Sequence, residues 1–296
     1  MNSSTRVRCG PTPTRLIRLA MTAGMVLAGA GAAVTVATPA QAAVVEVAVA
    51  GSGVVSATAF CPAGEFLSGG GGGVIGGGGD VTLTSIVPDL ATASVTARAH
   101  DNPGGSPNYS VVAQAICLPG LPPPNYTLKQ NIDGPSAGAS KNAVATCDPG
   151  TSLLGTGFDL DGAAGQAFLR WSVPDFNLTS HTVIANAAGG FGGVWQATSY
   201  AICATPPGLT TRRGHTSGSD PTNAKSATTI DCPGNSRTTG VGGAASTGPA
   251  VGGFVFVNRI GTDLAQQNAT AEAVEGLNPG AGVAWDLDVF SICWAP

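Results

Sequence analysis

The stretch CDPGTSLLGTG at residues 147–157 occurs in two other versions in this chain, CPAGEFLSGGG at 61–71 and CPGNSRTTGVG at 232–242. Each version begins with a cysteine and has glycines eight and ten residues after it. The first cysteines are 86 and 85 residues apart, as expected for copies of one structural unit. The chain therefore contains three tandem repeats, which we assign to residues 43–120, 121–206 and 207–296.

A second cysteine closes each repeat. An isoleucine precedes it in all three copies, and an aromatic residue stands eight positions ahead of it. Six cysteines allow 15 pairings, and the repeat favours one disulfide within each copy. We predict the bonds Cys61–Cys117, Cys147–Cys203 and Cys232–Cys293. Each closes a loop of about 57 residues, which the chain-entropy model values at roughly 4 kcal/mol.

Residues 1–42 have the features of an export signal. Four arginines and no acid lie in this segment, an apolar run follows from Leu19 to Val36, and Ala40-Gln41-Ala42 fits the signal-peptidase pattern. We therefore expect secretion by the general route with cleavage after Ala42, and an uncleaved membrane anchor is the alternative. No apolar run of 18 residues follows the signal, so we expect no membrane span in the mature chain.

Charge and composition narrow the class of partner. Without the signal, 9 basic residues stand against 17 acidic ones, a formal net charge of −8. An acidic chain is a poor match for nucleic acid. Because 43% of the residues are hydrophobic, disorder is also disfavoured.

The hydrophobic pattern within each repeat has a period of two. Val95, Ala97 and Ala99 alternate with polar residues, and the other copies show the same pattern, which is typical of half-buried strands. Further strands are expected at 81–87, 167–173 and 254–260, the first two ended by Pro88 and Pro174. We expect four or five strands per copy, with the disulfide joining the first strand to the last. The Pro/Gly/Ser-rich segments 118–140 and 204–224 are expected to be loops or extended linkers.

These features predict an all-β protein built from three antiparallel β repeats. A single copy of about 70 residues would bury only about 60% of its surface and would be marginally stable. We therefore expect three sheets around one axis, a β-prism-like body with threefold pseudosymmetry. Three independent beads are the alternative.

The motifs CPAGEFLSGG…AICLP, CDPGTSLLGTG…AICATP and CPGNSRTTGVG…SICWAP resemble those of uncharacterised secreted proteins of actinobacteria, over residues 50–296. More distantly, three cysteine-containing β repeats are similar in architecture to vitelline membrane outer layer protein 1. That resemblance implies a prism fold and a glycan-related role, and no functional residue can be matched to this chain.

No catalytic constellation stands out, and we expect a non-enzymatic protein without a cofactor or metal site. Ser136 fits a G-x-S-x-G pattern at 134–138, but no helical pattern follows it. The three mature histidines, His100, His181 and His215, occupy unrelated repeat positions. The acid pairs Asp159/Asp161 and Asp286/Asp288 each place two carboxylates on one face of a strand, which keeps a secreted hydrolase as an alternative.

The outward aromatic residues have two explanations, stacking on sugar rings and burial between sheets. Tyr109, Trp195 and Trp285 are expected in the core, and two further aromatics, Tyr200 and Phe290, are expected on the opposite face at the position of Gln114. Trp171, Phe176 and Trp294 recur less regularly. We expect a secreted binding or structural protein of the cell envelope or extracellular space, with a cell-surface glycan or protein as partner. A protease inhibitor presenting residues 204–224 is a further alternative.

Overall fold

The computed structural model describes residues 42–102, 108–205, 208, 210–247, 255–276 and 284–295, so the expected signal segment lies outside the described residues except for Ala42. Each repeat contributes six strands. The first holds β1 (Ala43–Gly51), β2 (Val54–Phe60), β3 (Glu65–Gly76), the 3-10 helix η1 (Gly78–Asp80), β4 (Val81–Asp89), β5 (Ser94–Asp101) and β6 (Tyr109–Pro119). The second holds β7 (Thr127–Ala137), β8 (Ser140–Thr146), β9 (Ser152–Asp161), β10 (Ala167–Pro174), β11 (Ser180–Ala187) and β12 (Val194–Ala204). The third holds β13 (Thr210–Thr216), β14 (Ala224–Thr228), β15 (Arg237–Thr247), β16 (Val255–Thr262), β17 (Ala269–Glu275) and β18 (Trp285–Trp294).

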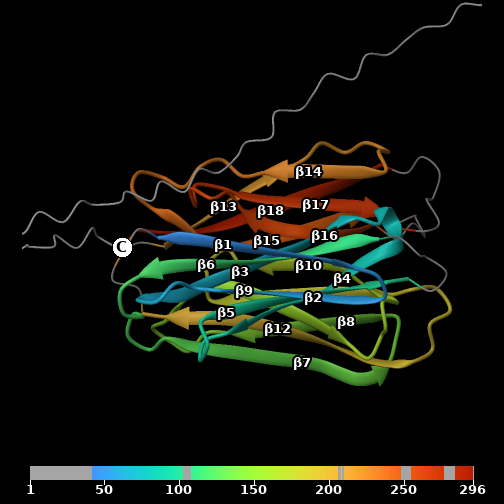
Figure 1. Cartoon of the computed structure of the whole chain (residues 1–296), viewed down its shortest axis with the longest axis horizontal. Coiled ribbons are helices and arrows are strands. Elements are labelled where there is room, and N and C mark those ends of the chain that lie inside the picture. Colours follow the sequence, from blue (N-terminus) through green and yellow to red (C-terminus); the bar gives the residue numbers. More distant parts are fainter. Residues whose placement is uncertain are drawn as a thin grey trace, which may run out of the picture. The chain divides into compact units, whose positions relative to one another are not determined.

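The strands form three six-stranded antiparallel sheets (Figure 1). Sheet 1 has the order β1-β6-β3-β16-β17-β14, sheet 2 the order β2-β5-β4-β9-β12-β7, and sheet 3 the order β13-β18-β15-β10-β11-β8. Each repeat gives its first, sixth and third strands to one sheet and its fourth, fifth and second strands to another. The repeats are therefore interlocked rather than separate beads. The prediction of an all-β, prism-like body with threefold pseudosymmetry is confirmed.

Two details of the sequence-based prediction were wrong. Each repeat has six strands rather than four or five, and the segments expected to be linkers contain β7 and β13. Both lie at the edge of a sheet, and their residues are mostly half-buried or exposed. An edge strand of this kind needs no alternating apolar residues, so the hydrophobic period did not reveal it. An edge position also tolerates Pro135 within β7, because proline lacks the N–H that a central strand requires.

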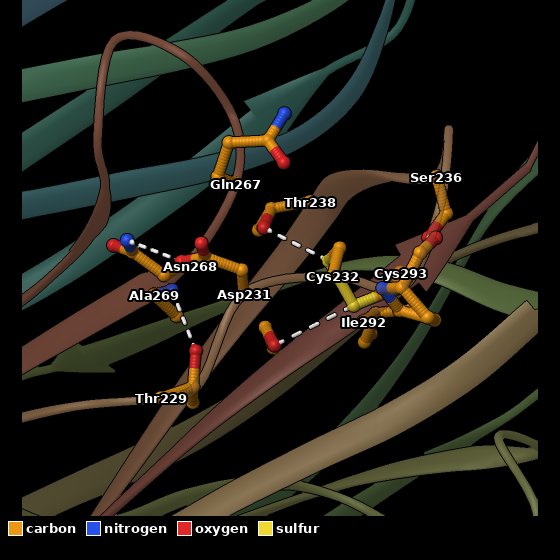
Figure 2. The surroundings of a disulfide bond; sticks show 12 residues. Thr229, Asp231, Cys232, Ser236, Thr238, Gln267, Asn268, Ala269, Ile292 and Cys293 are labelled. Atoms are coloured by element: carbon orange, nitrogen blue, oxygen red, sulfur yellow. Dashed lines mark hydrogen bonds between the residues drawn. A yellow bond between two sulfur atoms is a disulfide. The ribbon is translucent and has the colours of Figure 1, made fainter.

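All three predicted disulfides are present, with Cα–Cα separations of 5.6 Å. Each joins the last strand of its repeat, as expected, to the end of the second strand rather than to the first. Cys61 follows the second strand of its repeat, in sheet 2, and Cys117 lies on the sixth, in sheet 1. The equivalent bonds join sheets 2 and 3 and sheets 3 and 1. Around the third bond, the Cys232 sulfur lies 3.3 Å from the Thr238 hydroxyl (Figure 2). Each pair of sheets is thus cross-linked once.

The repeated glycines lie where the three sheets meet. A Cβ atom on Gly69 would stand 2.0 Å from the Thr239 carbonyl oxygen, and one on Gly155 would stand 2.2 Å from that of Ser68. For Gly240 the corresponding distance, to the Leu154 carbonyl oxygen, is 2.6 Å. The inner strands β3, β9 and β15 therefore contact one another backbone to backbone in a closed ring. Any side chain at these positions would force the sheets apart, which explains the repeated glycine.

One hydrophobic core fills the space between the sheets. Its members come from all three sheets and are mainly alanine and valine, with inward residues such as Ala97, Ala185 and Ala271 fully buried. The aromatic residues Tyr109, Trp195 and Trp285 are also buried, as predicted. Each donates a hydrogen bond to a backbone carbonyl, so none leaves a buried polar group unpaired.

Candidate functional site

Ser136 lies on edge strand β7, without the strand–turn–helix geometry that a nucleophile elbow requires. Its hydroxyl contacts the Nζ atom of Lys141, a buried lysine that also lies 5.6 Å from the centre of the Trp195 ring. Lys225 has the equivalent place in the third repeat, 4.9 Å from the Trp285 ring. This recurrence indicates that Lys141 anchors the turn by which the chain passes from β7 in sheet 2 to β8 in sheet 3.

His181 is fully buried between two serines. The Ser172 hydroxyl is 2.9 Å from its Nε2 and the Ser199 hydroxyl is 2.9 Å from its Nδ1. Burial lowers the pKa of His181 to about 3, so it is neutral under ordinary conditions. It has no access to a ligand. Elsewhere, His100 is half-buried at the end of β5, and His215 is exposed on β13.

The two acid pairs lie on different sheets. Asp159 and Asp161 share one face of β9 in sheet 2, and burial raises the pKa of Asp159 to about 6, against the lowering effect of Arg98. Asp286 and Asp288 share one face of β18 in sheet 3, opposite the face of Trp285, as predicted. Asp288 accepts a hydrogen bond from the Thr216 hydroxyl. None of the four carboxylates lines either of the two hollows described below.

In the part of the chain that the structure describes, no group of three or more histidine, cysteine, aspartate or glutamate side chains is arranged to hold a metal ion.

Sheet 3 and its β10–β11 turn carry three aromatic side chains that are exposed or half-buried. Trp171 on β10 is 39% exposed, Phe176 in the turn after β10 is 82% exposed, and Phe290 on β18 is half-buried. The threefold pseudosymmetry supplies an internal comparison. At these three positions sheet 2 has Ser85, Leu90 and Tyr200, and sheet 1 has Arg259, Leu264 and Gln114. Only sheet 3 has an aromatic residue at all three.

A hollow of about 350 Å³ lies beside Phe176. One wall is the turn between β10 and β11, and the other is β13, so the lining residues are Phe176, Asn177, Leu178, Thr210, Thr211, Arg212 and Arg213. The Asp175 carboxylate fixes the turn by accepting hydrogen bonds from the backbone N–H groups of Asn177, Thr179 and Ser180. Pairing with β18 fixes β13. Both walls are therefore held before any ligand arrives.

Two arginines face this hollow. The Cζ atom of Arg212 lies 4.0 Å from the centre of the Phe290 ring, a cation–π contact. The Nε atoms of Arg212 and Arg213 are buried and have no hydrogen-bond partner among the described residues. Burial lowers the pKa of Arg212, while Asp175 and Asp288 oppose this shift. The guanidinium groups therefore retain hydrogen-bond donors that the protein does not use.

At the positions that match Arg212 and Arg213, the other two sheets have no arginine. The strand register places Arg212 and Arg213 one and two residues beyond the partner of the second cysteine, where sheet 1 has Val44 and Val45. Sheet 2 has Leu128 and Lys129 there, and Lys129 forms an ion pair with Asp148 at 2.6 Å. These two arginines were not predicted as site residues, because residues 204–224 were expected to form a loop or linker. An alignment of β1, β7 and β13 would have shown the departure from aliphatic residues.

On sheet 1, a buried polar side chain occupies the position that corresponds to Phe290. There Gln114 is buried, and its amide donates to the Thr262 carbonyl oxygen at 2.9 Å and accepts from the Thr262 N–H at 2.8 Å. The hollow beside it measures only about 10 Å³, about enough for one water molecule. At the positions in sheet 1 that match the larger hollow, Gln266 takes the place of Leu178, and its amide donates to the carbonyl oxygens of Ala43 and Cys117.

No protein-family model matches this chain, and no curated protein does. The assignment of a function therefore depends on the geometry of the site.

Proposed function

We propose that this protein is an extracellular, non-enzymatic carbohydrate-binding protein, and that the outer face of sheet 3 is its binding face. The aromatic residues of that face carry the proposal. Trp171 and Phe176 present ring surface to solvent, and sugar rings stack their C–H faces on such surfaces. The hollow beside Phe176 adds a concave wall with polar donors, the usual form of a small-ligand site.

An extracellular location fits carbohydrate binding. Three disulfides persist in an oxidising environment and are rare in the cytosol, so they indicate an extracellular protein. Export by the predicted signal and release after Ala42 belong to the proposal. Among the described residues, no helix is long and apolar enough to cross a membrane.

The protease-inhibitor alternative has less support. An inhibitor of that kind presents an extended loop that a protease can grip, and residues 210–216 of the expected bait are instead paired with β18. The hydrolase alternative requires two carboxylates that converge in a cleft, and none of the four paired aspartates lines either hollow. Neither alternative is proposed further.

The test is a glycan array with the mature chain, residues 43–296, followed by affinity measurements on the best ligand. Two variants copy residues that the scaffold already accepts: Phe176→Leu matches Leu90 and Leu264, and Trp171→Ser matches Ser85. Because stacking on an aromatic ring contributes about 1 kcal/mol or more, each variant should weaken binding roughly fivefold or more.

The matched control is Leu264→Ala, which removes the equivalent exposed side chain from sheet 1 and should leave the affinity unchanged. An array without any signal at high protein concentration would refute the proposal. Binding that survives both aromatic substitutions would show that sheet 3 is not the binding face.

A further inference from the structure

We infer that the hollow between β13 and the β10–β11 turn binds the carboxylate of an acidic saccharide, with Arg212 and Arg213 holding the carboxylate and Phe176 stacking on the sugar ring. This inference rests on the proposed function and adds to it the chemical class of the ligand, a uronic-acid glycan. It does not follow from carbohydrate binding alone, since many aromatic platforms take neutral sugars.

The first argument is the pair of arginine residues that line one hollow. Arg212 and Arg213 are consecutive on β13 and both line the cavity. No ion pair forms at either arginine within the described residues, where the three salt bridges use Lys129, Lys225 and Arg259. A planar guanidinium matches the two oxygens of a carboxylate and forms stronger hydrogen bonds with it than with a neutral acceptor.

The second argument is the state of the nearby acids. Asp175 lies close enough to affect the pKa of Arg212, but its oxygens already accept hydrogen bonds from its own turn. Equivalent aspartates, Asp89 and Asp263, cap the same turn in the other two sheets. Asp175 is therefore a structural residue of the turn rather than a partner made for Arg212. Asp288, the other acid that affects the pKa of Arg212, accepts a hydrogen bond from Thr216, and neither aspartate forms an ion pair with the two arginines in the described part of the chain.

The third argument is the internal comparison. A scaffold with threefold pseudosymmetry needs no arginine at these positions, because sheet 1 has Val44 and Val45 there and forms the same strand pairing. Arginine side chains lose rotamer entropy and hydration when they are partly buried, so two of them beside a hollow lower stability unless a ligand uses them. The rest of the mature chain is acidic, which makes this local positive charge stand out.

The experiment compares two tetrasaccharide probes by calorimetry, α-1,4-linked tetragalacturonate and the same oligosaccharide with its carboxyl groups reduced to alcohols. A glucuronate pair prepared in the same way serves as the second probe set. Wild-type protein should bind at least one acidic probe roughly tenfold or more tightly than its reduced form, as expected for charge-assisted hydrogen bonds. Raising the salt concentration should weaken only the acidic form, because screening acts on the charge.

Variants of Phe176 and of the two arginines distinguish the contribution of the aromatic ring to binding from that of the positive charge. Arg212→Leu and Arg213→Val introduce the aliphatic residue types found at the same positions in the other sheets, and each should remove most of the preference for the acidic probe. Phe176→Leu should weaken the acidic and the reduced probe alike. The control Arg98→Gln removes the same charge from an exposed site on sheet 2 and should change nothing.

Failure of this inference is distinguishable from failure of the proposed function. Binding of neutral and reduced glycans that depends on Phe176, with no preference for a carboxylate, would overturn the inference alone. Absence of any glycan binding would overturn both. Equally tight binding of a hexaglutamate peptide would show that the site recognises acidic peptides rather than sugars.

Discussion

His181 occupies a place where the other repeats have valine and alanine. Ser172, His181 and Ser199 form one buried cluster, and the same three positions are Ile86, Val95 and Ala113 in the first repeat. The cluster joins β10 and β11 in sheet 3 to β12 in sheet 2. A polar group in this position stays buried only because both ring nitrogens have a hydroxyl partner.

This histidine makes the folded protein sensitive to acid. Its pKa is lowered to about 3 in the folded chain, whereas an unfolded chain takes up the proton near the ordinary value of 6.5. Its contribution to stability is therefore complete above pH 6.5 and is lost as the pH falls towards 3. Between pH 7.5 and pH 4.5 the loss should be about 3 kcal/mol in the free energy of unfolding. Urea titrations at the two pH values measure it.

The matched variant replaces the cluster by the residues of the first repeat, Ser172→Ile, His181→Val and Ser199→Ala. It should fold and should lose about 3 kcal/mol less than the wild type over this pH range. An identical pH dependence in both proteins would show that the acid sensitivity arises elsewhere. The single change His181→Val is a poorer test, because it leaves the buried Ser172 hydroxyl without its imidazole partner, whereas Ser199 keeps its bond to the carbonyl oxygen of residue 181.

The inner strands β3, β9 and β15 depend on glycine for their contact. In Gly155→Ala the new methyl group would stand 2.2 Å from the Ser68 carbonyl oxygen and 2.6 Å from the Gly69 Cα atom. Both are backbone atoms that cannot rotate away, so the variant should lose about 1–3 kcal/mol or more of its free energy of unfolding. Gly192→Ala, at a glycine with nothing within 4 Å, is the control and should change the thermal midpoint little. Equal midpoints in the two variants would contradict the ring of contacts.

The interlocked repeats make folding a property of the whole chain. In the full protein, one side of β3 pairs with β16 and one side of β4 pairs with β9. Both of these partner strands belong to other repeats and are absent from residues 43–120. This fragment should therefore remain unfolded even with the Cys61–Cys117 bond formed, since two half-sheets expose both their edges and their apolar faces. Circular dichroism and amide dispersion in NMR spectra would measure this. A cooperatively folded fragment would mean that each repeat is an independent bead after all.

Threefold pseudosymmetry also shapes the binding face. Three sheets with the same strand order offer three equivalent outer faces, and one of them carries the aromatic residues, the arginines and the larger hollow. A change confined to sheet 3 leaves the shared core and the glycine ring intact. Specialisation of one face is thus compatible with a scaffold that the other two faces keep.

The sequence was sufficient for every feature that depends on local repetition. The cysteine spacing predicted the repeats and the disulfide pairing, the alternation at Val95, Ala97 and Ala99 predicted a half-buried strand, and the glycines at fixed offsets supported the alignment of the three copies. Together these also led to the prism with threefold pseudosymmetry. Such signals are readable because a buried face imposes a period on neighbouring residues.

Other features required the folded chain. Strands β7 and β13 are edge strands without a buried period, so nothing local distinguishes them from linkers. The partition of each repeat between two sheets is set by pairing across more than 70 residues, as between Ser85 and Asp159 in the register of β4 and β9. The candidate site joins Phe176 to Arg212 and Arg213, which are some 36 residues apart in sequence. Long-range strand pairing brings them to one hollow, and a linear pattern cannot encode that proximity.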